Sequence, residues 1–181
     1  YSLIDFPEEL VSIGHWGIGL VTGWNYVGLD ERFTWVPTPL AGKDYIYTFF
    51  LTESLEYIGE YGLKNCQNTN IILGENVKQI GYRAFYNWES YHNGRGNEVL
   101  YCLSSTPPEV ENEAFLGEID YQEYYKHKCV VVPMGSKAAY EKVPGIANHF
   151  EEIVEVDDVM AYYHEQLPVG IEERENSVLS S

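Results

Sequence analysis

The sequence predicts a solenoid of short parallel β-strands, with little helix and with a C-terminal cap made of a short helix and a strand. A template of residues recurs along the chain, beginning at Leu51 and again 22 residues later at Leu73. Within each copy, apolar residues alternate with others over a few positions, which is typical of a short strand with one buried face. A unit this short cannot bury its apolar face alone, so successive units are expected to stack on one another.

Each copy of the template is expected to supply two short inward-facing segments joined by a turn. An apolar residue before a Glu ends the first segment, and an Ile followed by Gly ends the second. We expect the Gly to turn the backbone, because glycine adopts conformations closed to other residues. A small residue followed by a large one then closes the coil. The positions predicted to build the repeat are Ile13, Gly14, Leu51, Ile58, Gly59, Leu73, Ile80, Gly81, Phe85, Leu103 and Phe115.

Two stretches depart from the template. The copy that contains Ile13 precedes the one that contains Ile58 by 45 residues, close to two periods, so residues 19–48 are expected to hold one more coil. That stretch lacks the Ile-Gly and Ala-Phe pairs, and we favour a degenerate coil over the alternative, an insertion that replaces it. The connection around residues 86–97 is longer than the others and is expected to form a surface loop, as insertions in solenoids do.

The segments after the repeats predict the cap. Ser136 is expected to cap a helix over Lys137–Val143, and the pair Pro144-Gly145 is expected to end it. A final strand is predicted over Phe150–Val156, with its Glu side chains facing water. Acidic side chains on a last strand would discourage a further chain from stacking there.

The length and composition fit one folded domain with an acidic surface. The chain has 181 residues, of which 45% are hydrophobic, so a single core can form. With 28 acidic against 11 basic residues the formal charge is −17, which argues against a nucleic-acid partner. No apolar run reaches the length of a membrane span. We expect the repeat domain to cover residues 1–156 and residues 157–181 to form a tail or linker, with a short helix over Val159–Leu167.

The template Leu-x-Glu-x-Val-x-x-Ile-Gly-x-x-Ala-Phe resembles the BspA-like class of leucine-rich repeat. The stretch from Tyr101 to Pro108 is similar to the penultimate coil of such proteins, and that from Val130 to Val156 is similar to their terminal cap. The resemblance covers about residues 4–18 and 49–156. It implies a leucine-rich-repeat solenoid wound as a right-handed coil, of the kind found in surface or secreted proteins of Bacteroidetes-type bacteria that serve in adhesion.

The sequence carries no recognisable catalytic motif, so no enzyme activity is expected. It has no nucleophile elbow, phosphate-binding loop or metalloprotease signature, and its five His are scattered without metal-ligand spacing. Cys66, Cys102 and Cys129 fit neither a disulfide framework nor a zinc site, and we expect three buried thiols that pack as small hydrophobic side chains. No catalytic residue, metal site or cofactor is therefore predicted.

Aromatic side chains are the candidate binding residues, because they gather in the irregular stretches between the repeats. Rigid amphipathic rings on loops make good contacts to proteins or sugars. The alternative is that these rings cover the ends of the hydrophobic core where irregular coils leave gaps. The candidates are Trp24, Trp35, Trp88, Tyr91, Tyr124 and Tyr125.

Several functions remain open from the sequence. The first is a non-catalytic interaction module, secreted or at the cell surface, that binds proteins or mediates adhesion through the solenoid face and the aromatic loops. The alternatives are a glycan-binding accessory protein of a carbohydrate-utilising bacterium and a structural spacer in a longer surface protein. The expected partner is a protein or glycan of a host or neighbouring cell, and the open N-terminal coil is expected to allow weak self-association. The expected location is extracellular or at the cell surface, although the sequence shows no signal peptide.

Overall fold

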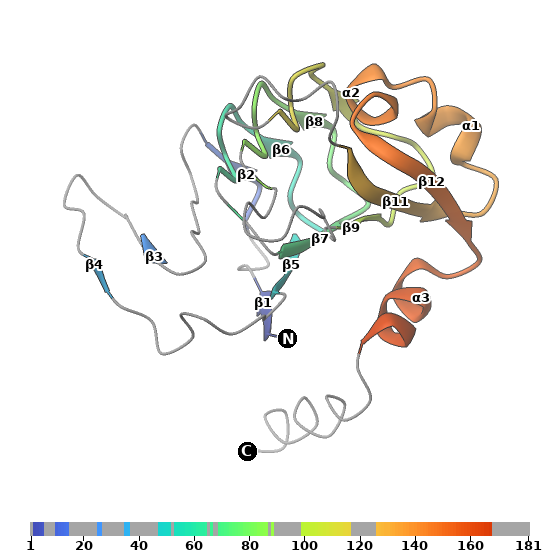
Figure 1. Cartoon of the computed structure of the whole chain (residues 1–181), viewed down its shortest axis with the longest axis horizontal. Helices are drawn as coiled ribbons and strands as arrows, with labels where there is room; N and C mark the ends of the chain where they lie inside the picture. The colour runs from blue at the N-terminus through green and yellow to red at the C-terminus, as the bar shows by residue number, and fades with distance from the viewer. Residues whose placement is uncertain are drawn as a thin grey trace.

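The computed structural model contains two parallel β-sheets, to which successive coils each contribute one strand (Figure 1). The larger sheet has six strands in the order β1-β5-β7-β9-β11-β12, and the smaller has four in the order β10-β8-β6-β2. The structure describes residues 2–5, 10–14, 25–26, 35–36, 47–51, 53–64, 66, 69–86, 88, 99–116 and 126–167.

The elements are short throughout the described part. The larger sheet comprises β1 (Ser2–Asp5), β5 (Tyr47–Leu51), β7 (Thr69–Leu73), β9 (Val99–Cys102), β11 (His127–Pro133) and β12 (Phe150–Val156). The smaller sheet comprises β2 (Ser12–Ile13), β6 (Tyr57–Ile58), β8 (Gln79–Ile80) and β10 (Glu109–Val110). The remaining elements are β3 (Asn25–Tyr26), β4 (Trp35–Val36), α1 (Lys137–Tyr140), α2 (Pro144–Ala147) and α3 (Val159–Gln166).

The coils stack in register over most of the predicted template. Leu51 pairs with Leu73 across β5 and β7, and Ile58 pairs with Ile80 across β6 and β8. Backbone hydrogen bonds also join the turns of neighbouring coils beyond the strands. The prediction of a repeat fold made of parallel strands is therefore confirmed for the described coils.

Leu103 does not occupy the position that the template gives it. Leu73 pairs with Cys102, whereas Ile80 pairs with Val110, so the segment between the two strands is one residue longer in this coil than in the one before. Cys102 accordingly points into the core, and Leu103 packs, partly buried, on the opposite face of the sheet. The prediction for Leu103 is wrong because the extra residue turns its side chain to the other face.

Among the described strands of the two sheets, none lies between the first coil, with β1 and β2, and the coil that holds β5 and β6. The first strand, β1, pairs directly with β5, and β2 pairs directly with β6, with no strand between them in either sheet. Within this stretch, residues 25–26 and 35–36 form β3 and β4, an antiparallel pair separate from both sheets, and Tyr47 and Thr48 begin β5 of the larger sheet. The pairing of the described strands favours an insertion over a degenerate coil, and most of residues 19–48 lies outside the described residues.

The repeated glycines have a different role from the predicted one. Among the described glycines only Gly135 has a positive φ, of 84°. In the turns after β6 and β8, the residues with a positive φ are Tyr61 and Arg83. Gly81 lies instead against the neighbouring coil, where an added Cβ would meet the Glu60 nitrogen at 3.0 Å and the Gly59 carbonyl carbon at 3.1 Å. The glycine in this coil is needed because two backbones approach closely there.

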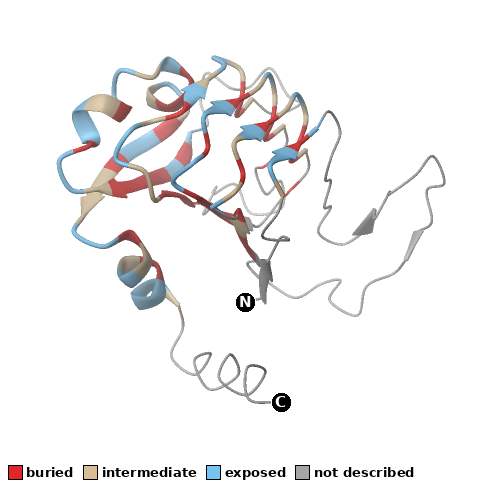
Figure 2. Cartoon of the chain, turned by 180° about the vertical axis from the view of Figure 1, so that it is seen from behind, coloured by how far each residue is buried: buried red, intermediate tan, exposed pale blue. Residues whose placement is uncertain are grey.

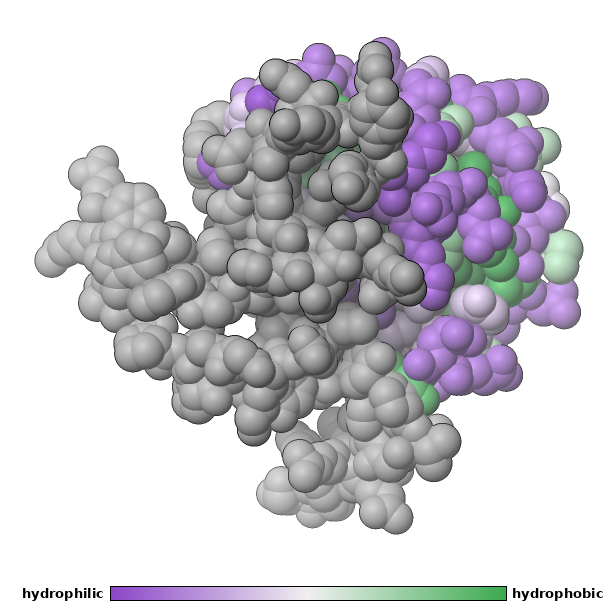
Figure 3. Space-filling model, viewed as in Figure 1, coloured by the Kyte–Doolittle hydropathy of each residue, from purple (hydrophilic) through white to green (hydrophobic). Residues whose placement is uncertain are grey.

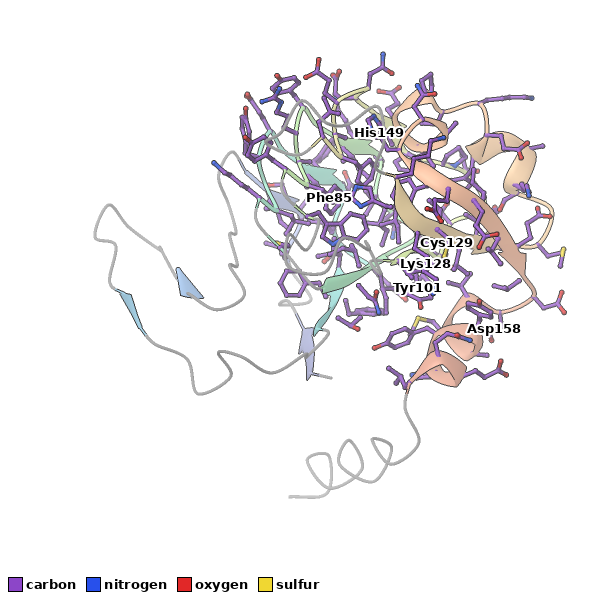
Figure 4. The ribbon with its side chains drawn as sticks, in the orientation of Figure 1. Phe85, Tyr101, Lys128, Cys129, His149 and Asp158 are labelled. Atoms are coloured by element: carbon purple, nitrogen blue, oxygen red, sulfur yellow. The ribbon has the colours of Figure 1, made fainter. Side chains whose placement is uncertain are left out.

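The main hydrophobic core fills the space between the two sheets. Leu, Ile and Val side chains from both sheets meet there, together with the aromatic rings of Phe85, Trp88 and Phe115. Figure 4 shows Phe85 pointing into this interior. Cys66, Cys102 and Cys129 are all buried thiols, as predicted.

The cap is built as expected in outline but not in detail. The Ser136 side chain makes no cap hydrogen bond and donates instead to the Pro133 carbonyl oxygen. The Lys137 N–H at the start of α1 donates to Glu155 Oε1 at 2.7 Å, so a carboxylate of β12 does the capping. The pair Pro144-Gly145 begins a second short helix, α2, since Pro is well suited to a first helical position. In the described part, β12 forms the predicted edge strand.

The helix predicted after the last strand belongs to the folded domain. Asp158 caps α3 by accepting a hydrogen bond from the Ala161 N–H at 2.9 Å. Val159 and Tyr163 of α3 pack on the face of the larger sheet that points away from the main core, where the Tyr163 and Tyr101 rings meet edge to face with centroids 5.2 Å apart. The boundary predicted after residue 156 is therefore too early. Among the described helices, none has the length and apolar character needed to cross a membrane.

Candidate interaction surface

The outer face of the smaller sheet presents one exposed residue from each coil in a row. Ser12, Tyr57, Gln79 and Glu109 are in register from strand to strand, and all four are exposed. The next residue of each strand points inward, so the two-residue strands alternate between solvent and core. Figure 2 shows these strands side by side at the surface, each exposed at its first residue.

A shallow hollow, called the groove here, lies on this face. It has a volume of about 510 Å³ and is bordered by the residues before β8 and before β10. Its lining combines exposed polar side chains and one aromatic ring with the apolar residues Val77, Pro107 and Pro108. The lining includes Tyr57, Glu75, Lys78, Gln79, Thr106 and Glu109.

The turns that follow β6 and β8 carry a second feature, which we call the tyrosine cluster: Tyr61, Lys64, Tyr82, Arg83 and Tyr86. The Tyr61 ring meets the Tyr82 and Tyr86 rings edge to face, with centroids 6.0 Å and 5.5 Å apart. Lys64 Nζ lies 5.1 Å from the Tyr86 ring centroid, and Arg83 Cζ lies 5.2 Å from the Tyr82 centroid. These distances are within the range of cation–π attraction.

Backbone strain coincides with the tyrosine cluster. Tyr61 and Arg83 have φ values of 53° and 47°, in the left-handed region that costs a non-glycine residue roughly 1–2 kcal/mol. Hydrogen bonds between turns hold the conformation, with the Tyr61 N–H donating to the Tyr82 carbonyl at 3.2 Å and the Arg83 N–H to the Glu113 carbonyl at 3.2 Å. Glycine would fit both positions without strain, whereas here the strained conformation is adopted by two side chains that take part in the contacts of the cluster.

The side of the molecule that carries this face is acidic. The described stretches 53–64, 75–86 and 104–116 contain seven Glu against three basic residues. Lys78 Nζ lies 2.9 Å from Glu56 Oε1, and the hydrogen bond with Glu56 raises the pKa of Lys78. Arg83 Nε lies 3.6 Å from Glu113 Oε2. Partial burial and then a hydrogen bond with Glu113 raise the pKa of Tyr82.

The structure corrects one of the six predicted binding aromatics. Trp88 is fully buried, with its ring 5.5 Å from that of Phe85, 5.9 Å from that of Phe115 and 4.7 Å from that of His127 between centroids. It closes the end of the core, so the prediction of a surface contact is wrong for Trp88. The backbone of Trp35 lies in β4. The side chain of Trp35 lies outside the described part, as do the whole residues Trp24, Tyr91, Tyr124 and Tyr125.

Two exposed rings that were not among the candidates lie on this side instead. Tyr57 is 43% exposed and Tyr82 is 37% exposed. The signal for Tyr57 was present in the template, because a residue just before the inward-facing Ile58 of a strand must point outward. For Tyr82 the template gave no such signal, since the path of the turn decides where its ring lies.

The described residues offer little for catalysis. Burial raises the pKa of the Cys102 thiol to about 12 and that of Cys129 to about 11, so both thiols stay protonated and weakly nucleophilic at neutral pH. Burial lowers the pKa of His127 to about 4, and its imidazole Nδ1 has no hydrogen-bond partner in the described part. No group of three or more His, Cys, Asp or Glu side chains in that part is placed to hold a metal ion.

Comparison with known proteins identifies the repeat. Residues 40–98 match the family model described as BspA type leucine rich repeat region (6 copies). The match covers β5 to β8, where two successive coils pair in register in both sheets, so this part of the chain is similar to BspA-type leucine-rich repeats. No curated protein and no solved structure shows significant similarity to the chain.

Proposed function

We propose that this chain is a non-catalytic interaction module of a secreted or cell-surface protein, which binds a partner protein through the outer face of the smaller sheet and the turns beside it. BspA-type repeats form a family of interaction modules that are generally not enzymes and are typically found on surface or secreted proteins. Stacked repeats suit this task, because they extend one binding face across several coils.

The distribution of exposed hydrophobic side chains is the observation that carries this proposal. Four large hydrophobic residues are exposed in the described part: Val11 at 50%, Tyr57 at 43%, Tyr82 at 37% and Met134 at 58%. The first three lie on the smaller sheet or in the segments that flank its strands, whereas Met134 lies in the cap. Tyr and Arg side chains, which are the common energetic centres of protein interfaces, gather on the same side in the tyrosine cluster. The surface visible in Figure 3, by contrast, is mainly hydrophilic over its coloured part.

The proposal also concerns the direction in which the coils wind. We infer that the coils close into a right-handed solenoid, because crossovers between parallel strands of one sheet are almost always right-handed. The parallel order of both sheets supports this inference. A crystal structure of the chain with left-handed crossovers would contradict it.

The binding proposal is tested with the double substitution Tyr57→Ala and Tyr82→Ala. The unaltered chain, immobilised, is presented to a panel of purified extracellular-matrix and bacterial surface proteins. We expect the double variant to lose the binding that the unaltered chain shows, while Met134→Ala, a matched change at an exposed residue of the cap, keeps it. Equal binding by both variants, or a panel that the unaltered chain does not bind at all, would count against the proposal.

A further inference from the structure

We propose that the groove receives an arginine side chain from a basic surface of the partner protein. This inference rests on the function proposed above, since it names the chemistry of the partner for the same face. Three features of the groove carry it: an exposed aromatic ring, carboxylates that the described residues leave without a partner, and an excess of negative charge around them.

Tyr57 supplies the ring. In the described part of the chain, no aromatic ring packs on it and no cation lies over its face, although the neighbouring Lys78 interacts with it electrostatically. The rings of the tyrosine cluster, by contrast, are in contact with one another and with Lys64 and Arg83. Its exposure of 43% leaves ring surface available at the wall of the groove. A cation from a partner is attracted to such a surface.

Glu75 and Glu109 supply the carboxylates. Both line the groove and are exposed, and neither carboxylate has a hydrogen bond or ion pair with a described residue. Gln79 pairs with Tyr57 on one side and Glu109 on the other, so the backbones of Tyr57 and Glu109 are separated by two strand spacings of about 4.8 Å each. The neighbouring cation, Lys78, is already held by Glu56 at 2.9 Å.

Arginine fits this arrangement better than lysine. A planar guanidinium can stack on an aromatic ring and at the same time donate two parallel hydrogen bonds to a carboxylate, whereas an ammonium acts as a point charge. The seven Glu against three basic residues on this side attract a basic partner and repel an acidic one. The same charge argues against anionic glycans as the occupant.

The test uses a hexa-arginine peptide as the probe, with the full chain at low ionic strength. Binding is measured by calorimetry, and its location by the chemical shifts of backbone amides. We expect the largest shifts at Tyr57, Gln79 and Glu109, and no binding of a hexa-citrulline peptide, which keeps the shape and lacks the charge. Binding of the arginine peptide should be weakened about two- to fivefold in the variant Tyr57→Leu. A similar loss is expected in the double variant that combines Glu75→Gln and Glu109→Gln.

The matched control is Glu151→Gln with Glu152→Gln, which removes two exposed carboxylates of β12. This strand belongs to the larger sheet, whereas the groove lies on the smaller one. The control should leave the Kd and the pattern of shifts unchanged. Equal loss of affinity in the control, shifts centred on β12, or equal binding of the citrulline peptide would overturn the inference. If the arginine peptide does not bind the groove but binding of a partner protein is still lost in the Tyr57→Ala and Tyr82→Ala double variant, only the arginine assignment is wrong. If binding of a partner protein is not affected by the double variant either, the proposed function is wrong as well.

Discussion

At the scale of single residues, burial decides the role of the aromatic and titratable side chains. Trp88 and His127 lie against each other in the core, with Phe115 and Phe150 completing an aromatic group around the imidazole. His127 Nε2 lies 3.4 Å from the Phe115 carbonyl oxygen, and Nδ1 has no partner among the described residues. Such an imidazole is held neutral, because a charged one would lose its hydration without gaining a counter-charge.

His127 predicts that the fold is sensitive to acid. Burial lowers its folded-state pKa to about 4, below the ordinary value of 6.5. The stability that depends on the neutral form is therefore fully present above pH 6.5 and falls as the pH decreases toward 4, by up to about 3 kcal/mol. Urea unfolding at pH 7 and pH 4 should show a smaller difference in the free energy of unfolding for His127→Phe than for the unaltered chain. His164→Gln, at an exposed histidine, should keep the full difference, and equal differences in all three chains would refute the prediction.

Substitution of Trp88 is expected to lower the stability of the fold and not to remove a surface contact. Replacing this fully buried ring in Trp88→Ala should lower the free energy of unfolding by about 3–5 kcal/mol, because it removes a large apolar side chain and leaves a cavity. The exposed ring removed in Tyr57→Ala should change it by less than about 0.5 kcal/mol. Denaturant titration of both variants measures the contrast, and similar values for the two would show that the assignment of core and surface is wrong.

At the scale of elements, close backbone contact controls how the cap meets the last coil. Helix α2 packs against the end of β10, and Gly145 lies at the point of contact. An added Cβ there would come within 2.6 Å of the Glu111 carbonyl oxygen and 2.7 Å of Val110 Cγ1. The glycine allows the helix to sit directly on the coil, so the cap covers the end of the smaller sheet.

Gly145→Ala is accordingly expected to destabilise the protein, although Gly→Ala within an exposed helix normally stabilises it by about 1 kcal/mol. The overpacking should cost about 1–3 kcal/mol, because a carbonyl oxygen cannot move aside as a flexible side chain can. Gly14→Ala is the matched control, since an added Cβ there meets nothing within 4 Å. Thermal unfolding should show a lower midpoint for Gly145→Ala alone; an unchanged or raised midpoint would mean that the cap is not packed in this way.

At the scale of the whole molecule, the larger sheet is covered on both faces over β7, β9 and β11. One face borders the core between the sheets, with α1 and α2 at the C-terminal end of that core, and the other bears α3. Figures 1 and 2 show α3 on the opposite side of β11 and β12 from α1 and α2. This covering explains why Ile72, Tyr101 and Val131 are apolar although they point away from the main core.

A chain truncated after Val156 is therefore expected to be less stable than one that ends at Leu167 and keeps α3. Loss of Val159 and Tyr163 exposes the apolar face beneath them and should cost about 3 kcal/mol or more. Urea unfolding of the two truncated chains measures the difference directly. Equal stability would show that α3 is an appendage and that the domain does end at residue 156.

The sequence by itself determined the period of the repeat, the inward positions such as Ile58 and Ile80, and the edge strand of the cap. These follow from the alternation of neighbouring residues, which is a local property of the chain. Only the tertiary structure decided that β1 meets β5 directly, that Cys102 and not Leu103 faces the core, and that Trp88 is buried while Tyr57 is exposed. Each of these depends on which distant segments of the chain come together. The repeat pattern does not specify this, because it does not show how an insertion or one additional residue changes the register between neighbouring coils.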